Sequence, residues 1–378
     1  MSQAGPRVIL NDRVLLSPRT GVGHYVAELI AGLRAACPDI RLVAPCTQYL
    51  AAGRHLAESG ECGPPPPRRS ALGRAVLERA YQQAFRLAGK LHRCALYHEP
   101  CHVPGPWGGA TLTTVHDLSV LRHPEWHPAD RVRWYERHFV AGIERSTHVI
   151  AVSEFTKREL VELLGVPAAR ITVIYNSARR VFSVLPRDEV IARLRAAGLP
   201  TEYFLYVGTL EPRKNLDGLL AAYAHLPRPA RERFALLVTG PAGWGAGPSG
   251  SLVRHLAGQV RFLGYQDDRA LALLYAGARA LVWPSFYEGF GCPPLEAMRC
   301  GTPVITSNTS SIPEVVGEAA ILVDPHQPEQ IAAAMQGLME DSVRAADLGA
   351  RGLERSARFS WEACAAAHAE LYRRFGDG

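Results

Sequence analysis

The sequence lacks the features that would place it in several common classes of protein. It has no uninterrupted apolar run of about 18 residues, so no transmembrane helix is expected. Its eight cysteines form no Cys-x-x-Cys pair and no cluster with histidine, which argues against a metal site and favours reduced thiols. It has no Walker-type loop of glycine, lysine and serine, which argues against a P-loop NTPase. No apolar signal segment follows Met1, so we expect a cytoplasmic protein.

Lysine is also scarce, since only Lys90, Lys157 and Lys214 contribute to the 42 Lys and Arg residues. The charge is uneven along the chain. Residues 1–200 hold 26 Lys and Arg against 17 Asp and Glu, a net charge of +9, whereas residues 201–378 have a net charge of −3. The basic half is therefore expected to meet an anionic partner, such as a membrane surface or an acidic acceptor. Nucleic acid is not expected as a partner, because no recognition motif is present.

Strand-like apolar runs alternate with amphipathic segments along the chain. They lie at 8–10, 41–44, 111–115, 148–152 and 171–175, and again at 203–207, 234–238, 260–263, 280–283 and 303–306. Such alternation predicts an α/β fold of two Rossmann-like, doubly wound parallel-sheet domains that face each other across a cleft. We predict a first domain over 1–180, a second over 181–360 and a final helix within 361–378.

The run 285–298 carries the most informative functional pattern. It follows the apolar segment 280–283, crosses a Gly-x-Gly turn and enters a helix near Pro293, where proline suits the first turn. Glu288 precedes the turn, and Glu296 is expected in the first helical turn, so both carboxylates can face one cleft. Helix starts favour phosphate, and carboxylates accept hydrogen bonds from hydroxyls. The pattern therefore suits a sugar nucleotide.

Together with the segments 301–305 and 311–315, this run resembles the retaining glycosyltransferases of family 4, which have the GT-B fold. The resemblance extends through nearly the whole chain. It implies a retaining, metal-independent hexosyltransferase whose last helix crosses back onto the first domain. The sequence contains no Asp-x-Asp, so the metal-bridged diphosphate site of the other main glycosyltransferase fold is not apparent. No cofactor is expected beyond the nucleotide diphosphate sugar, which is a co-substrate.

The resemblance also implies roles for residues in the second half of the chain. Glu288 would lie near the donor sugar, with the backbone of Gly289, Phe290 and Gly291 beside it, and Glu296 would hold the nucleotide ribose. Arg213 and Lys214 would bind the diphosphate. Many relatives carry arginine where this chain has Thr209, which leaves more of the phosphate charge to those two cations. The alternatives are that the two glutamates are solvated or capping residues and that 208–215 is a solvated loop with Asn215 as a helix N-cap.

In the first half, the resemblance implies two further contributions to the site. His116 follows a predicted strand and would lie near the reacting sugar as a catalytic residue. Gly21 and Gly23 would bring a glycine-rich loop close to the donor phosphates and the acceptor. A lone histidine is more often structural, and turn glycines are common, so these alternatives stay open.

Residues 68–93 read as a basic amphipathic helix. Seven basic residues and one acidic residue, Glu78, interleave with apolar side chains at roughly helical spacing. Such a helix could lie on anionic lipid, which would make the protein peripheral on the inner face of the cytoplasmic membrane. The alternative is an ordinary surface helix whose apolar side packs on the sheet.

The motifs look most like those of family members that build bacterial surface polysaccharides, which are often mannosyltransferases. The expected donor is GDP-mannose or a related GDP-hexose, and the expected acceptor is a glycan or a lipid-linked oligosaccharide. Two other classes stay open. An NAD-dependent oxidoreductase would require the glycine pattern at 245–250 to bind a dinucleotide, although Pro248 interrupts it and the preceding strand ends too early. The second of these classes is a catalytically silent nucleotide-sugar-binding protein.

Overall fold

The computed structural model describes residues 5–16, 21–49, 71–101, 103–245 and 247–376, with the backbone alone at 49 and 71–79. These residues form two compact units, each built on its own six-stranded parallel sheet. The first unit comprises Met1–Leu118, Arg133–Asn176 and Ser360–Gly378, and the second comprises Ser119–Val132 and Ser177–Phe359. The predicted α/β class with two doubly wound parallel sheets is confirmed.

The first sheet has the strand order β2-β1-β3-β4-β5-β6. Its strands are β1 (Arg7–Leu10), β2 (Arg41–Val43), β3 (Leu96–Glu99), β4 (Ala110–Val115), β5 (His148–Ala151) and β6 (Ile171–Val173). The order reverses between β1 and β3, so the connections that follow these two strands run in opposite directions. In open α/β sheets, ligands bind at such a reversal, at the carboxyl ends of the strands.

Side chains on alternate sides of β1 enter two separate hydrophobic cores, as expected for a strand that is covered on both faces. Val8 and Leu10 pack with α1 (Gly21–Ala36) and α17 (Trp361–Gly376). Ile9 packs on the other face with Phe85 of α4 (Ala71–Leu91). The unit also contains α2 (Pro45–Tyr49), α7 (Glu154–Leu164) and most of α6 (Ala129–Arg145).

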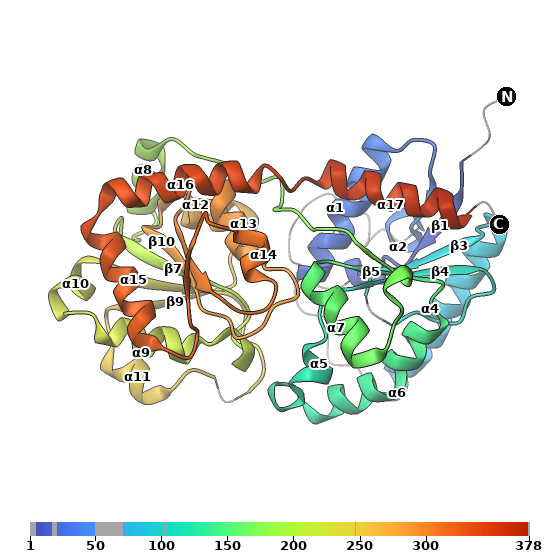
Figure 1. Ribbon diagram of the computed structural model, residues 1–378, viewed down its shortest axis with the longest axis horizontal. Helices are drawn as coiled ribbons and strands as arrows, with labels where there is room; N and C mark the ends of the chain where they lie inside the picture. The colour runs from blue at the N-terminus through green and yellow to red at the C-terminus, as the bar shows by residue number, and fades with distance from the viewer. Residues whose placement is uncertain (1–4, 17–20, 50–70, 102, 246, 377–378) are drawn as a thin grey trace. The chain divides into compact units, whose positions relative to one another are not determined.

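The last helix, α17, belongs to the first unit and runs beside α1 (Figure 1). A buried polar network crosses their interface. The hydroxyl of Tyr25 lies 2.9 Å from Nε2 of His368, and the hydroxyl of Tyr372 lies 2.7 Å from Nδ1 of His98. Thr114 of β4 completes the network, 2.8 Å from Nε2 of His98. The network satisfies buried polar groups and fixes how α17 docks.

Two strands, β3 and β12 (Ile321–Val323), were not predicted from the sequence. In β3, the residues Leu96, Tyr97, His98 and Glu99 are all buried, although three of them are ionisable. Apolar patterning cannot find such a strand, because its polar side chains are buried through specific hydrogen bonds rather than through hydrophobicity.

The second sheet has the strand order β12-β11-β10-β7-β8-β9. Its remaining strands are β7 (Tyr203–Val207), β8 (Ala235–Thr239), β9 (Val260–Gly264), β10 (Ala280–Trp283) and β11 (Val304–Ser307). Its longer helices are α8 (Arg187–Ala196), α9 (Leu216–His225), α12 (Asp268–Gly277), α13 (Cys292–Arg299), α15 (Pro328–Glu340) and α16 (Ser342–Ser356); the shorter ones are α10 (Arg228–Arg233), α11 (Gly250–His255) and α14 (Ile312–Val316). Here the order reverses between β7 and β10, which brings the connections after these strands together.

The segment Ser119–Val132 groups with the second unit, although the predicted first domain over 1–180 contains it. It includes α5 (Ser119–Arg122) and the short turn of helix Pro124–Trp126. The ring of Trp126 stacks on Phe286 with 6.0 Å between centroids. The indole N–H of Trp244 donates a hydrogen bond of 2.7 Å to the carbonyl oxygen of Trp126. Aromatic packing therefore assigns this segment to the second unit.

Part of the predicted basic helix lies outside the described residues, namely residues 68–70 and the side chains of 71–79. The remainder forms the second half of α4. No helix in the described part of the chain combines the length and the apolar character needed to cross a membrane.

Candidate functional site

The loops after β7 and β10 meet at the strand-order reversal of the second sheet. The loop 208–215 follows β7, and the loop 284–291 follows β10. Two hydrogen bonds tie them together, because the carbonyl oxygen of Arg213 accepts from the backbone N–H of Phe286 at 2.9 Å and from the hydroxyl of Ser285 at 3.1 Å. The predicted donor-binding cations and the predicted catalytic glutamate therefore lie in one place.

Glu288 is held by two cations and a hydroxyl. Its Oε2 accepts a hydrogen bond of 2.9 Å from Arg213, and its Oε1 accepts one of 2.5 Å from Lys214 and one of 2.6 Å from Ser285. Arg213 also pairs with Glu211 at 2.8 Å. The side chains of Arg213 and Lys214 are only 13% and 12% exposed, which excludes the alternative of a solvated loop.

The charge state of Lys214 is set by opposing effects. Burial lowers the pKa of its ammonium, and the neighbouring Arg213 lowers it further, whereas the carboxylates of Glu288 and Glu211 raise it. The net direction is downward. The lysine ammonium also lies 4.6 Å from the ring centre of Trp283, a cation–π contact that favours the charged form. A bound anion would favour the charged form again.

Asn215 fixes the start of the helix that follows. Its backbone is left-handed, with φ of 53°, and its Oδ1 accepts a hydrogen bond of 3.1 Å from the N–H of Gly218, so it is the N-cap of α9. Its side-chain amide donates to the carbonyl oxygens of Pro284 and Pro325 at 3.0 and 2.7 Å. The cap that belonged to the alternative reading is thus present, although the loop is not solvated, and it holds the adjacent cations in place.

The turn from Glu288 to Gly291 is fixed by side chains of the segment 309–311. The hydroxyl of Ser311 donates to the carbonyl oxygens of Glu288 and Phe290, at 2.9 and 3.0 Å. Gly291 has φ of 107°, and a Cβ there would lie 2.7 Å from Ile312, so only glycine fits. Gly289 and Phe290 are both buried, so this turn is packed within the second unit.

Glu296 lies in the second turn of α13, because the helix begins at Cys292; the prediction of the first turn is wrong. Its Oε1 accepts a hydrogen bond of 3.0 Å from Arg179, and its Oε2 accepts one of 2.9 Å from the hydroxyl of Tyr275. Arg179 also pairs with Asp268. Burial alone would lower the pKa of Arg179, but the two carboxylates raise it.

Sequence reasoning missed Arg179. It lies next to the predicted boundary between the domains at 180, where an arginine carries no distinguishing signal. Only the fold shows that Arg179 is not an ordinary polar linker residue, because its side chain is almost fully buried against Glu296.

Cys292 connects the two glutamate clusters. Burial raises the pKa of its thiol to about 12, and the charges of Glu296, Arg179, Glu288 and Lys214 all act on it. The first residue of α13 is therefore within electrostatic reach of both clusters.

His116 lies at the carboxyl end of β4 in the first unit. Its Nε2 is 2.8 Å from the carbonyl oxygen of Pro100; since a carbonyl only accepts, this nitrogen carries the proton. The imidazole packs edge-on against Tyr25 of α1, with 4.8 Å between ring centroids. Burial lowers the pKa of His116, so the neutral form is favoured.

Gly21 and Gly23 form the first turn of α1. A Cβ at Gly21 would meet no atom within 4 Å, so packing does not require glycine there, whereas a close approach of ligand to backbone would. Tyr25 comes from the same helix and contacts His116. The structure therefore brings the start of α1 and His116 to the same part of the first unit.

The first unit also has a cavity of about 620 Å³ at its strand-order reversal. Asn11, which follows β1, and Glu99, which ends β3, lie in its wall. Tyr81 and the half-exposed Trp134 contribute aromatic rings. The other lining residues are Arg13, Gln82, Phe85, Arg86, Tyr97, Val103, Pro104, Gly105, Pro106, His138 and Arg145.

Glu99 is the central acid of this cavity. Its Oε2 accepts hydrogen bonds from Asn11 at 2.7 Å and from Tyr97 at 2.5 Å, and its Oε1 accepts one of 2.8 Å from the N–H of Cys101. Burial raises the pKa of Glu99 to about 7, although these hydrogen bonds oppose the shift. Sequence reasoning missed Glu99 because it did not recognise β3 as a strand. Had the strand been recognised, a carboxylate at its end would have indicated a candidate site residue.

The glycine pattern at 245–250 does not form a dinucleotide-binding turn. Strand β8 ends at Thr239, whereas the helix that would bind the diphosphate, α11, begins only at Gly250 and is short. The tight strand–turn–helix that such a site needs is therefore not formed. Within the described residues, no group of three histidine, cysteine, aspartate or glutamate side chains is placed to hold a metal ion.

Comparisons with known proteins agree with this geometry. Residues 194–355 match the family described as glycosyl transferases group 1, and residues 19–178 match glycosyltransferase family 4. The chain is 35% identical to the O-antigen chain mannosyltransferase B of Escherichia coli, over 97% of this chain and 99% of that protein.

Solved structures show the same fold. A sucrose-phosphate synthase from Thermosynechococcus elongatus superposes with a TM-score of 0.73 at 23% identity, covering 98% of each chain. WaaG, a glycosyltransferase involved in lipopolysaccharide biosynthesis, superposes with a TM-score of 0.69 at 16% identity, covering 97% of this chain and 99% of that one. These likenesses place the two parallel sheets in the GT-B class of glycosyltransferase folds.

Proposed function

The chain belongs to glycosyltransferase family 4, and we propose that it transfers a hexose from GDP-mannose, or a related GDP-hexose, to a glycan or a lipid-linked oligosaccharide. The general class, a glycosyltransferase of the GT-B type, follows from the comparisons above. The donor, the acceptor, retention of configuration and independence of metal are our proposals. The name of the Escherichia coli relative supports mannose as the sugar and a bacterial surface polysaccharide as the product.

The observation that carries the proposal is the cluster of Arg213, Lys214 and Glu288 at the strand-order reversal of the second sheet. Two preorganised cations there suit a diphosphate, and they can stabilise the negative charge that develops on it as it leaves. They supply positive charge that a metal ion would otherwise supply, which supports metal independence. Glu288 keeps them in position before the donor arrives.

The remaining site residues receive the following roles. Glu288 and the backbone of Gly289, Phe290 and Gly291 position the donor sugar. Glu296, oriented by Arg179 and Tyr275, accepts hydrogen bonds from the ribose hydroxyls through the remaining lone pairs of its carboxylate. In the first unit, His116 acts on the reacting sugar, and Gly21 and Gly23 allow ligand close to the backbone. The leaving phosphate takes the acceptor proton.

The cavity beside Glu99 is our candidate for the acceptor. An apolar face of a sugar ring can lie on the indole of Trp134 while its hydroxyl groups reach Asn11 and Arg13. Aromatic walls with a few convergent polar groups are typical of ligand sites. We also propose that the basic segment 68–93 contacts an anionic membrane, at the inner face of the cytoplasmic membrane, where a lipid-linked acceptor would be available.

Thermal unfolding of the purified protein with GDP, UDP, ADP, TDP or NAD tests the donor class. A ligand at about 100 times its dissociation constant stabilises the fold by roughly 2.7 kcal/mol. We expect GDP to raise the midpoint, and GDP-mannose to yield mannosylated acceptor with the anomeric configuration of the donor. A shift with NAD alone would overturn the proposal. Stabilisation by GDP without transfer to any glycan acceptor would favour the silent nucleotide-sugar-binding protein, and an inverted product would refute the retaining mechanism.

A further inference from the structure

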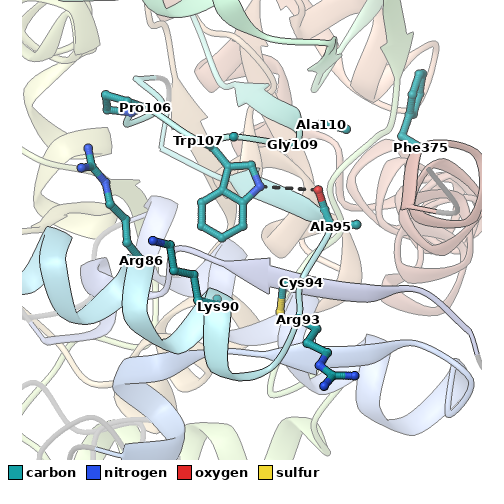
Figure 2. A pocket seen from close by; sticks show the side chains of 12 residues that line it. Arg86, Lys90, Arg93, Cys94, Ala95, Pro106, Trp107, Gly109, Ala110 and Phe375 are labelled. Atoms are coloured by element: carbon teal, nitrogen blue, oxygen red, sulfur yellow. Dashed lines mark hydrogen bonds between the residues drawn. The ribbon is translucent and has the colours of Figure 1, made fainter.

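A second cavity, of about 800 Å³, lies in the first unit (Figure 2). Its lining residues precede β3 and β4, whereas His116 follows β4, so the cavity lies at the opposite edge of the sheet from His116. It is bounded by the last turns of α4, by Ala95 just before β3, and by the segment 106–110 that leads into β4. Phe375 of α17 lies at its far side. The cavity is therefore at the amino ends of the strands. The length of β4 separates it from the carboxyl edge, roughly 20 Å for a strand of this size.

The charged side chains that line this cavity are all cationic. Arg86, Lys90 and Arg93 line it, and no carboxylate is among its lining residues. All three side chains are exposed, and in the described part of the chain none of them makes an ion pair or a side-chain hydrogen bond. Arg86 and Lys90 lie one turn apart on α4, and Arg93 follows the end of the helix. Three unneutralised cations that line one cavity favour an anion.

The backbone at Arg93 supports a functional role for this side chain. The helix ends in a Schellman motif, in which the N–H of Cys94 donates to the carbonyl oxygen of Gly89 at 2.8 Å. The left-handed position of that motif, φ of 52°, is occupied by Arg93, whereas glycine is the usual residue there. A non-glycine residue in this uncommon conformation is compatible with a role for its side chain.

The apolar surroundings decide which anion fits. Gly89 allows the indole of Trp107 to lie directly against α4, since a Cβ would be 2.2 Å from the ring, and this indole forms a wall of the cavity. Next to the cationic face, Leu87 and Leu91 are 58% and 73% exposed. A free phosphate would satisfy the cations but leave both leucines in water. A bilayer surface satisfies both, because phosphate groups lie above the acyl chains that leucines enter.

We propose that this cavity binds the phosphate headgroup of an anionic phospholipid, with Lys90 and Arg93 on the phosphate and Leu87 and Leu91 in the acyl boundary. The inference rests on the proposed contact with an anionic membrane and assigns that contact to one site at the end of α4. Because the cavity and His116 lie at opposite edges of the sheet, a bound lipid leaves the carboxyl edge open to an acceptor glycan.

The test is co-sedimentation of the full chain with vesicles of phosphatidylcholine alone or mixed with phosphatidylglycerol. The charge variant is K90Q/R93Q, and the apolar variant is L87S/L91S; Arg86 stays intact because it also lines the candidate acceptor cavity. The matched control, R254Q/R269Q, removes two exposed cations from the second unit. At about a fivefold contribution per cation, the charge variant is expected to bind phosphatidylglycerol vesicles roughly 30-fold more weakly, whereas the control binds normally.

Three results would overturn the assignment. These are equal binding to both kinds of vesicle, unchanged binding of the charge variant, and thermal stabilisation by inorganic phosphate that requires Lys90 and Arg93 while vesicles do not bind. Unchanged binding of L87S/L91S would also count against a bilayer. Transfer to a soluble acceptor glycan is measured in parallel. If the charge variant loses vesicle binding but still transfers sugar, the lipid site is supported separately from catalysis. If the unmodified chain transfers no sugar, only the proposed catalytic function is refuted.

Discussion

At the scale of single residues, Lys214 is the most informative cation, because the chain has so few lysines for comparison. It is buried between Glu288 and Trp283, whereas Lys157 lies in α7 of the first unit. We expect Lys214→Met to weaken GDP binding about 30-fold or more, since it removes one member of a buried charge cluster. Titration calorimetry measures this, with Lys157→Met as the matched control. Equal affinities of the two variants would remove Lys214 from the donor site.

Substitution of Glu288 should affect GDP binding and sugar transfer differently. Glu288→Gln keeps the shape but removes a negative charge between two cations, so GDP should bind at least as tightly as before. Transfer should fall about 100-fold or more, because the residue that positions the donor sugar is lost. Glu211→Gln is the control, since it removes the other carboxylate on Arg213. Parallel losses of transfer and GDP affinity would contradict a role directed at the sugar.

The pair of Arg179 and Glu296 gives a prediction about stability. Removing one partner of a buried ion pair leaves the other charge unpaired, so Arg179→Gln should lower the free energy of unfolding of the second unit by about 3–5 kcal/mol. The double variant R179Q/E296Q should recover part of this loss. An exposed pair gives the comparison, because Arg351→Gln at the Asp347 contact should change stability by less than about 1 kcal/mol. Denaturant unfolding distinguishes these outcomes.

At the scale of elements, the docking of α17 on the first sheet depends on two neutral histidines. Burial lowers the pKa of His98, helped by the charges of His368 and His116, and burial lowers the pKa of His368 to about 4. The unfolded chain, with histidine near 6.5, therefore binds more protons at acid pH than the folded chain. This stability is present above about pH 6.5 and is lost as pH falls from there toward 4.

We therefore expect the first unit to lose up to about 1.4 kcal/mol per pH unit for each histidine below pH 6.5. Thermal unfolding from pH 7.5 to pH 5 measures the slope. The exposed His326 of the second unit supplies the control, since His326→Gln should leave the slope unchanged. In His368→Gln the slope should be shallower, and an unchanged slope there would contradict the assignment.

The elements that the sequence predicts well are those whose signal is local. The strand before Glu288, the proline-marked start of α13 and the N-cap at Asn215 all depend on neighbouring residues, and all are present. What could not be predicted depends on residues that the topology brings together from distant positions. Arg179 reaches Glu296 from the stretch between the units, and Glu99 becomes a strand-end acid only because Asn11 and Tyr97 permit its burial.

At the scale of the whole molecule, the last helix belongs to the first unit. Removing this helix should therefore destabilise the first unit and not the second. The buried residues of α17 include Trp361, Ala365 and Tyr372, which form part of the core with Leu29 and Leu33. Truncation after Phe359 should therefore unfold the first unit and leave the second folded. Hydrogen exchange should then show protection lost in β1 and β4 but retained in β7 and β10. Loss of protection in both sheets would contradict separate cores.

The same helix has a consequence for the order in which the protein forms during synthesis. A chain leaving the ribosome usually completes its first domain before its second. Here the residues that close the first core follow those of the second unit in the chain, so the second unit has its whole sequence available while the first still exposes the apolar surface that α17 covers. The first unit is thus the later one to complete its core, because that core closes only once α17 has been synthesised.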